Sequence, residues 1–573
     1  MTSLRYIPAI MKFMPKTLTR NKEFFSYGIL LSAVLIANLI ASLWNVDPYH
    51  EGAIFPTATG LAQGLNVFDG VSQQYGFLLP LVISPFLKVF GTYLFVSRLV
   101  SFVLLILLTF LTYKVSCIYM NRKVAFYASL LWLSVSPIWS YTMFGRSLSG
   151  GAWPNHLAMI LVLLSILLIS NSRAQTRSIS VSSAAFLTFL SSQARMEFFL
   201  VWFFISLFLL MRDRKIFFYW IIGSTLAILT IFSYLLSNSA VDDWFNQTIK
   251  VWTLDAPDVP TIGLGFFFWN GLNFVALAAI LPLTLLLYHF LQFKLSSLVR
   301  IFVLVVFLIF LTSVSQFLPD SISILGRNVA TILDFAAQRT LFSYVNVVIL
   351  SSLIIGFVAV FRRTQKRKHP SSGIDLLNGI LWCTAIGILG VFHNTNADYT
   401  SITVAPFLIL TLGYFFPASS ETNPRLISIL KEYVAAVVTV SLVIFCLHFP
   451  KQVHEYDTPV LKNLYAQNLV EAKNLDARFH QIAKHTGNSR FLMDCQIGML
   501  SVNERGFQGL DKWTWNQQPA IMIANRLQNL ESGDYAVTCH LNEEDLNFLK
   551  SEEGLQKFSI EFADGDFSIL KVN

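Results

Sequence analysis

Long apolar blocks with almost no charge are the feature that most constrains the fold of this 573-residue chain. Segments such as 25–44, 154–171 and 341–361 approach the roughly 20 apolar residues that a helix needs to cross the ~30 Å hydrocarbon core of a bilayer. Charged residues make up 13% of the chain, whereas soluble proteins contain about a quarter. The sequence therefore predicts a polytopic α-helical membrane protein.

About thirteen membrane-crossing segments are expected. Two short runs, 179–193 and 196–211, are expected to form a helix pair that meets at the outer surface, or to be re-entrant. The expected crossings are 25–44, 94–118, 124–141, 154–171, 179–193, 196–211, 216–236, 267–292, 299–318, 341–361, 374–392, 402–416 and 431–449.

The distribution of charge predicts the orientation. If the N-terminus lies in the cytoplasm, 22 of the Lys and Arg residues before residue 450 fall on cytoplasmic segments. The other seven fall on the outer side. Acidic residues divide the opposite way, with eleven outside and five inside. Because cytoplasmic loops carry the excess of Lys and Arg, this topology is the expected one, and thirteen crossings leave the C-terminus outside.

The C-terminal region differs in character from the apolar region before it. Residues 450–573 hold 12 basic and 17 acidic residues, a net charge of −5 in a chain of +8. Helical stretches at 460–485, 517–530 and 543–550 alternate with strand-like runs at 490–494, 535–540, 558–562 and 567–572. This pattern predicts a small extracytoplasmic α/β domain.

The expected organisation is a basic cytoplasmic N-terminus (1–24), a membrane domain (25–449) whose first outer loop spans 45–93, and the outer domain (450–573). Cys117, Cys383 and Cys446 are expected in helices, while Cys495 and Cys539 form either a disulfide or two buried thiols. The sequence has no phosphate-binding or dinucleotide-binding glycine motif, and its basic residues are explained by cytoplasmic anchoring, so no nucleic-acid partner is expected.

The first outer loop carries the strongest candidates for chemistry. Asp47, His50 and Glu51 follow directly on the first apolar segment. Ionisable groups packed against a bilayer are costly and tend to mark function. The alternative is that Asp47 caps a helix and that His50 and Glu51 are solvated interfacial groups.

Motifs in this loop resemble the opening of GT-C-type membrane glycosyltransferases, a superfamily that includes protein O-mannosyltransferases and the bacterial transferases that add aminoarabinose to lipid A. The matching stretches are DPYHEG at 47–52, AxGLxxGLNVFDG at 58–70, QYGFLLP at 74–80 and VFGxxxxxSR at 89–98. The residues at the family positions are Asp47, Gly64, Asp69, Tyr75, Gly76 and Arg98.

Two later stretches are similar to the same family. LSSQARMEFFL at 190–200 resembles its short outer turn with Arg195 and Glu197. The stretch 392–410 resembles its late segment and contains His393 and Asp398, but Tyr399 and Thr400 stand where His is more usual.

The resemblance implies transfer of a sugar from a polyprenyl-phosphate donor. Such transfer needs a base for the acceptor hydroxyl. Asp47 is the first candidate, Glu51 the second and His50 a proton partner, and the choice between Asp47 and Glu51 stays open because the family often has two adjacent acids. A metal requirement also stays open: no cofactor is implied with certainty, and a divalent metal is compatible.

The departing phosphate needs positive charge, which Arg supplies through bidentate donors. Arg195 and Arg98 are the leading candidates, followed by Arg146, Arg327 and Arg339. The alternative for each is contact with lipid headgroups.

Further substrate contacts are expected from Asp69, Tyr75, Glu197, His156, His393 and Asp398. His156 at a helix start, and His393 with Asp398, have structural explanations as well. The loop 237–266 is expected either to cover the site as a lid or to lie at the interface as an aromatic belt.

The leading hypothesis is an inverting glycosyltransferase in a bacterial inner membrane, acting outside the cytoplasm on a glycan, lipid or protein acceptor. The alternatives are a glycan ligase or polymerase with a diphosphate-linked donor, a lipid or sugar transporter, and a non-catalytic scaffold. A transporter would show internal repeats and mid-membrane carboxylates, and the sequence shows neither.

Overall fold

In the computed structural model of the chain, the described residues are 22–44, 46, 51–68, 76–134, 153–171, 176–250, 299, 303, 323–324, 327–328, 373–388, 403, 405–416, 418, 424–448, 453–466, 469–489, 491–493, 502–503, 506–507, 530–538, 551–564 and 567–573.

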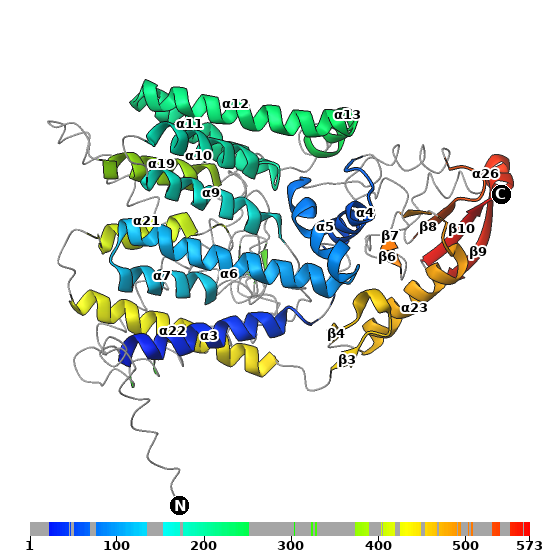
Figure 1. The fold of residues 1–573 in the computed structure, drawn as a ribbon. Coiled ribbons are helices and arrows are strands. Elements are labelled where there is room, and N and C mark those ends of the chain that lie inside the picture. The colour runs from blue at the N-terminus through cyan, green and yellow to red at the C-terminus, as the bar shows by residue number, and fades with distance from the viewer. Residues whose placement is uncertain are drawn as a thin grey trace, which may run out of the picture.

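The described part of the membrane region is a bundle of long helices that lie side by side (Figure 1). One row runs α12–α10–α9–α6–α7–α22–α3, and α11, α19 and α21 pack along it. The helices are α3 (Lys22–Ala41), α6 (Leu94–Tyr119), α7 (Arg122–Ser134), α9 (Pro154–Ser170), α10 (Arg177–Ser191), α11 (Phe199–Arg212), α12 (Arg214–Ser237), α19 (Gly373–Ile388), α21 (Ala405–Phe415) and α22 (Pro424–His448).

Apolar side chains on the outside of this bundle indicate what surrounds it. On α12, Phe218, Leu229 and Leu236 are 62%, 57% and 67% exposed, and α6 exposes Val103 and Phe110. Water does not favour a large surface of this kind, whereas lipid does. Leu94–Tyr119 and Arg214–Ser237 are long and apolar enough to cross a membrane. These helices and the exposed apolar faces agree with the predicted polytopic helical membrane protein, and several of the thirteen predicted crossings lie outside the described residues.

For the first seven predicted crossings, the described helices begin and end close to the residues that the sequence predicts. The pair expected at 179–193 and 196–211 forms α10 and α11, joined by a tight turn and the 3-10 helix η2 (Met196–Phe198). The expected crossings 267–292 and 341–361 lie outside the described residues, as does 299–318 apart from two positions.

The two ends of the bundle differ in charge. Arg122 and Lys123 begin α7, Arg177 begins α10, and Arg212, Arg214 and Lys215 surround the turn from α11 to α12. These residues lie together at one end, the basic end (Figure 1). We call the opposite end, where α3 ends and α6 and α9 begin, the loop end. The basic end is the one that the charge rule predicts to be cytoplasmic.

The loop end carries short helices between α3 and α6. They are the 3-10 helix η1 (Glu51–Ala53), α4 (Phe55–Ala62) and α5 (Leu78–Phe90). After α12 come α13 (Val241–Trp244) and the π-helix η3 (Phe245–Lys250). A separate apolar cluster joins the two groups, because Phe68 and Phe77 pack with Leu235 of α12, and Phe77 stacks on Tyr234 at 5.3 Å.

The C-terminal residues combine helices with small sheets. A four-stranded sheet has the order β5-β8-β10-β9, in which β5 is parallel to β8 and the other pairs are antiparallel. The strands are β5 (Phe491–Met493), β8 (Tyr535–Thr538), β9 (Phe558–Asp564) and β10 (Phe567–Val572), with α23 (Leu469–Thr486) and α26 (Glu552–Lys557) beside them. The four expected strands are therefore present.

One expectation in this region was wrong. The helix predicted at 460–485 begins only at Leu469. Before it lie β3 (His454–Glu455), the 3-10 helix η5 (Pro459–Leu461) and β4 (Tyr465–Ala466), and β3 and β4 form an antiparallel pair. The chain turns at Asn463, whose φ is +65°, a conformation that Asn tolerates and a helix does not contain. Two further short strands, β6 (Val502–Asn503) and β7 (Gly506–Phe507), and the pair β1 (Ser323–Ile324) and β2 (Arg327–Asn328), were not expected.

Polar side chains and small residues join neighbouring helices of the bundle. Trp202 of α11 donates to Ser224 of α12, and Trp220 of α12 donates to Ser206 of α11, both at 2.8 Å. Gly223 of α12 faces α10 so closely that a Cβ there would fall on the carbonyl group of Ser182. Small residues that let helix backbones approach are a common basis of helix packing in membranes.

We expect Gly223→Ala to separate α10 from α12 and to lower stability by about 1–3 kcal/mol, as overpacking does. Gly28→Ala in α3 is the matched control, since a Cβ there meets nothing within 4 Å. The apparent melting temperature in detergent measures both variants. A melting temperature of Gly223→Ala equal to that of Gly28→Ala would contradict the close contact.

Candidate functional site

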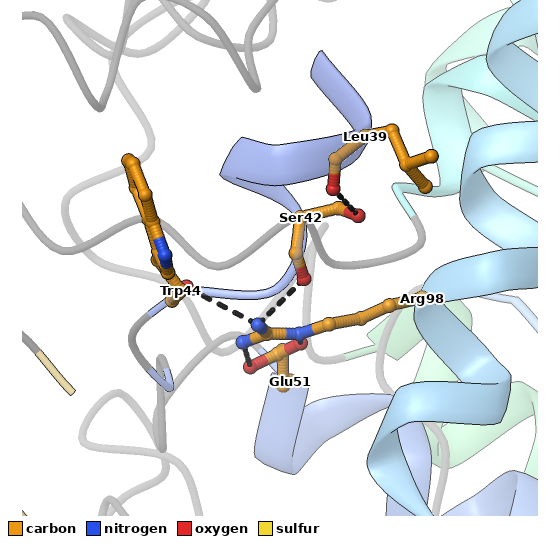
Figure 2. A network of polar contacts seen from close by, with 5 residues as sticks. All are labelled: Leu39, Ser42, Trp44, Glu51 and Arg98. Carbon is orange, nitrogen blue, oxygen red and sulfur yellow. Dashed lines mark hydrogen bonds and ion pairs between the residues drawn. The ribbon is translucent and has the colours of Figure 1, made fainter. Parts of the chain in front are cut away.

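A buried ion pair connects the first loop to the bundle at the loop end. Arg98, in the second turn of α6, donates from Nε to Oε1 of Glu51 at 2.8 Å and from an Nη to Oε2 at 2.9 Å. Figure 2 shows this bidentate arrangement. Arg98 is 0% exposed and Glu51 4%, so neither group lies at a lipid headgroup. Two parallel charge-assisted bonds in a buried site form a strong and directional contact.

The same guanidinium also contacts the end of α3. Its other Nη donates to the carbonyl oxygens of Ser42 at 2.8 Å and Trp44 at 3.2 Å (Figure 2). The last carbonyl groups of a helix lack partners within the helix and need donors from elsewhere. Arg98 supplies them, so a single side chain joins α3, η1 and α6.

A second polar cluster surrounds Arg195, which lies in the turn between α10 and α11 and is 3% exposed. Its Nε donates to Glu197 at 3.0 Å, and an Nη donates to Oδ1 of Asn155 in the first turn of α9 at 2.9 Å. Glu197 is 23% exposed, far more than Glu51. The motif at 190–200 was expected to supply Arg195 and Glu197 as separate substrate contacts, and the structure pairs them with each other.

His156 follows Asn155 and is fully buried. Neither ring nitrogen of His156 meets a hydrogen-bond partner among the residues that the structure describes, and the same holds for Oε1 of Gln193. Buried polar atoms are normally paired, so unpaired ones in a native structure need an explanation such as a bound water or ligand. The structure therefore brings Arg195, Glu197 and Asn155 together, and His156 is the next residue of α9 after Asn155.

The turn that holds Arg195 also contacts the first loop. The backbone N–H of Leu78 donates to the carbonyl oxygen of Gln193 at 3.0 Å. A Cβ at Gly76 would fall on that same carbonyl, so the glycine of the motif at 74–80 permits the contact. Because α6 packs on α9 and both helices begin at the loop end, the two arginine clusters lie at one end of the molecule.

The segment after α12 lies against the first loop as well. Nε2 of Gln247 donates to the carbonyl oxygen of Phe68 at 3.4 Å, and Trp244 packs in the same apolar cluster. Phe68 has a φ of +67°, which is uncommon for a bulky residue. The described part of the expected lid, residues 237–250, thus contacts the first loop through Gln247 and Trp244, and its function as a lid stays a prediction.

Most of the other predicted site residues lie outside the described residues. Val46 and Glu51, which flank residues 47–50, are both buried. Arg327 falls on β2, where only the backbone is described. The predicted residues without a described position are Asp47, His50, Asp69, Tyr75, Arg146, Arg339, His393 and Asp398, together with Cys495 and Cys539.

In the described part of the chain, no group of three or more His, Cys, Asp or Glu side chains is placed to hold a metal ion. The metal requirement stays open, since eight predicted site residues are not described.

Sequence reasoning identified both arginines but missed several of their partners. The carbonyl groups of Ser42 and Trp44 and the side chain of Asn155 were not expected as partners of the arginines. Backbone carbonyls carry no signal in the sequence. A usable signal was the position of Arg98 in an otherwise apolar helix, because a buried arginine requires a carboxylate partner nearby.

Comparisons with known proteins identify similar structures but no sequence family. No family model matches the chain, and no curated protein matches it. Two similar solved structures are crystal structures of ArnT from Cupriavidus metallidurans. The structure bound to undecaprenyl phosphate has 10% identity and a TM-score of 0.44, and covers 96% of this chain and 98% of that one. The apo structure has 9% identity and a TM-score of 0.44, and covers 95% and 98%.

With identities of 10% or less and a TM-score of 0.44, this likeness does not assign a family or an activity to the chain.

Proposed function

We propose that the protein is an inverting glycosyltransferase that moves a sugar from a polyprenyl-phosphate donor to an acceptor on the non-cytoplasmic side of a bacterial inner membrane. The observation that carries the proposal is the gathering of two buried arginine clusters at the loop end, beside the first loop and opposite the basic end. A lipid-linked donor presents its phosphate at a membrane boundary, where these clusters would meet it.

The two arginines have different parts in this proposal. The acid partner of Arg195 is 23% exposed, so a phosphate that approaches from solvent can compete for the guanidinium. The acid partner of Arg98 is 4% exposed and binds one edge of the guanidinium with both carboxylate oxygens. Arg195, which Asn155 joins to the start of α9, is therefore the proposed phosphate ligand, and Arg98 supports the loop.

The same geometry favours Asp47 over Glu51 as the base. A carboxylate whose two oxygens are both bound by a buried guanidinium is not oriented to accept a proton from an acceptor hydroxyl, which a base must reach within hydrogen-bond distance. Glu51 is in this position, whereas Asp47 lies four residues earlier in the same loop. Both clusters lie at helix ends rather than at helix centres, which supports an interfacial enzyme over a transporter.

We expect Asp47→Asn to lower sugar transfer by roughly 100-fold to 10,000-fold, the contribution of a general base, with an unchanged melting temperature. Transfer from a synthetic polyprenyl-phosphate sugar by the purified protein is the measurement. Asp242→Asn is the matched control, because Asp242 is exposed on α13 at the same end of the bundle. Full activity of Asp47→Asn would refute the base assignment, and no transfer by the parent protein from any such donor would refute the function.

Glu51→Gln tests the other carboxylate. It leaves a buried guanidinium without its counter-charge, so we expect a loss of about 3–5 kcal/mol in stability. The double variant Glu51→Leu with Arg98→Met should recover part of that loss, since apolar residues of similar size often replace a buried ion pair without cost. Thermal unfolding in detergent measures all three proteins. A Glu51→Gln variant that unfolds at the parent temperature but transfers no sugar would instead identify Glu51 as the base.

A further inference from the structure

The end of α3 is held from two sides. The carbonyl groups of residues 42, 43 and 44 all accept hydrogen bonds. The donor is Arg98 for the first and third and the backbone of Tyr465 for the second. Arg98 binds the carbonyl oxygens of Ser42 and Trp44. The backbone N–H of Tyr465 donates to the carbonyl oxygen between them, that of Leu43, at 3.0 Å. Trp44 and Tyr465 form a parallel β-bridge at this point.

Tyr465 belongs to the hairpin formed by β3, η5 and β4, which packs on the bundle rather than projecting from it. Val460, Leu461 and Leu464 are at most 2% exposed and share one apolar core with the membrane helices. η5 contacts α6, the helix that carries Arg98. Figure 1 shows β3 and β4 just beyond the end of α3.

The hairpin is in turn ordered by α23. Asp476 of α23 accepts hydrogen bonds from the backbone N–H of Asp457 at 3.0 Å, and from the N–H and hydroxyl of Thr458 at 3.2 Å and 2.6 Å. Thr458 directly precedes η5. A continuous set of bonds and packed side chains thus leads from Asp476 to Leu43.

We propose that this hairpin is a positioning element of the site: Tyr465 and Asp476, more than 400 residues after Leu43 in the sequence, fix residues 42–44 and Val46, the described residues that directly precede the proposed base, Asp47. The inference rests on the proposed function in that Asp47 is its base. Asp47 is three residues beyond Trp44, and Val46 between them is 1% exposed. Tyr465 and Asp476 are positioning residues and are not expected to touch substrate.

The first measurement is the accessibility of residue 46 to a thiol reagent, which does not depend on sugar transfer. In a variant whose five native cysteines are replaced, Val46→Cys reports on the segment, and Leu105→Cys, at a fully buried position of α6, reports on the bundle. Tyr465→Pro removes the N–H that binds Leu43, and Asp476→Asn weakens the bonds to Thr458 by a second route. Tyr465→Phe keeps the backbone donor and is the control.

We expect labelling of Val46→Cys by a maleimide to be about fivefold faster or more in Tyr465→Pro and Asp476→Asn, because the loss of a hydrogen bond raises the population of the open segment. Labelling of Leu105→Cys stays slow in both, which shows that the bundle is intact. The kcat for sugar transfer should fall roughly tenfold or more, as small misplacements of a reacting group do, with KM for the donor little changed.

Unchanged labelling of Val46→Cys in both variants would overturn the inference. Faster labelling with unchanged kcat would overturn it too, because the segment would then move without affecting the base. If the parent protein transfers no sugar, the proposed function fails, and faster labelling still supports the control of residues 42–46 by the hairpin. If Leu105→Cys is labelled faster in Tyr465→Pro, this variant disturbs the whole bundle. The result for Asp476→Asn then decides whether the inference holds.

Discussion

The buried ion pair between Arg98 and Glu51 is the contact on which the loop end depends. A guanidinium that is 0% exposed costs several kcal/mol in desolvation unless a carboxylate and other acceptors surround it. Glu51 meets this requirement with both oxygens, and the end of α3 meets it with two carbonyl groups. Because Arg98 is fixed in α6, the chain that leaves α3 must return to this helix within the few residues that separate Trp44 from Glu51. The ion pair therefore holds Glu51 and the end of α3 against the same side chain of α6.

Arg195 is also a buried guanidinium that needs a carboxylate and other acceptors around it, but its carboxylate is more exposed than that of Arg98. Arg195 is buried and joined to α9 through Asn155, but its carboxylate partner remains partly accessible. An ion pair with one accessible member can exchange that member for another anion at a lower desolvation cost than a fully buried pair. The difference in exposure between Glu197 and Glu51 separates a group that can respond to a ligand from one that supports the fold. Both arginines were leading phosphate-binding candidates in the sequence, and the exposure of their acid partners distinguishes them in the structure.

Local features of the sequence were sufficient to predict where the helices lie along the chain. They were insufficient to predict the contacts between helices. The bounds of α6, α9, α10 and α12 follow from unbroken apolar runs, and the C-terminal strands follow from short β-rich runs. The region 460–485 was misjudged because its helical composition continues through the turn at Asn463, while burial against α6 stabilises short strands and a 3-10 turn instead. The partner of Arg98 lies 47 residues away. Spacing along the chain cannot give such a pairing, although the need for some carboxylate partner could have been inferred.

The contact of Tyr465 with Leu43 could not have been predicted from the sequence. Its donor and acceptor are both backbone groups, so any residue other than proline can provide the bond, and no side chain marks its position. Arg98 differs, because a lysine would offer a point charge without the planar fork that binds both oxygens of Glu51. The end of α3 is thus held on one side by a contact that tolerates almost any sequence and on the other by a contact that tolerates one residue type. A mutation at position 98 would therefore act directly, whereas the C-terminal side is sensitive to changes in the shape of the hairpin rather than to the identity of residue 465.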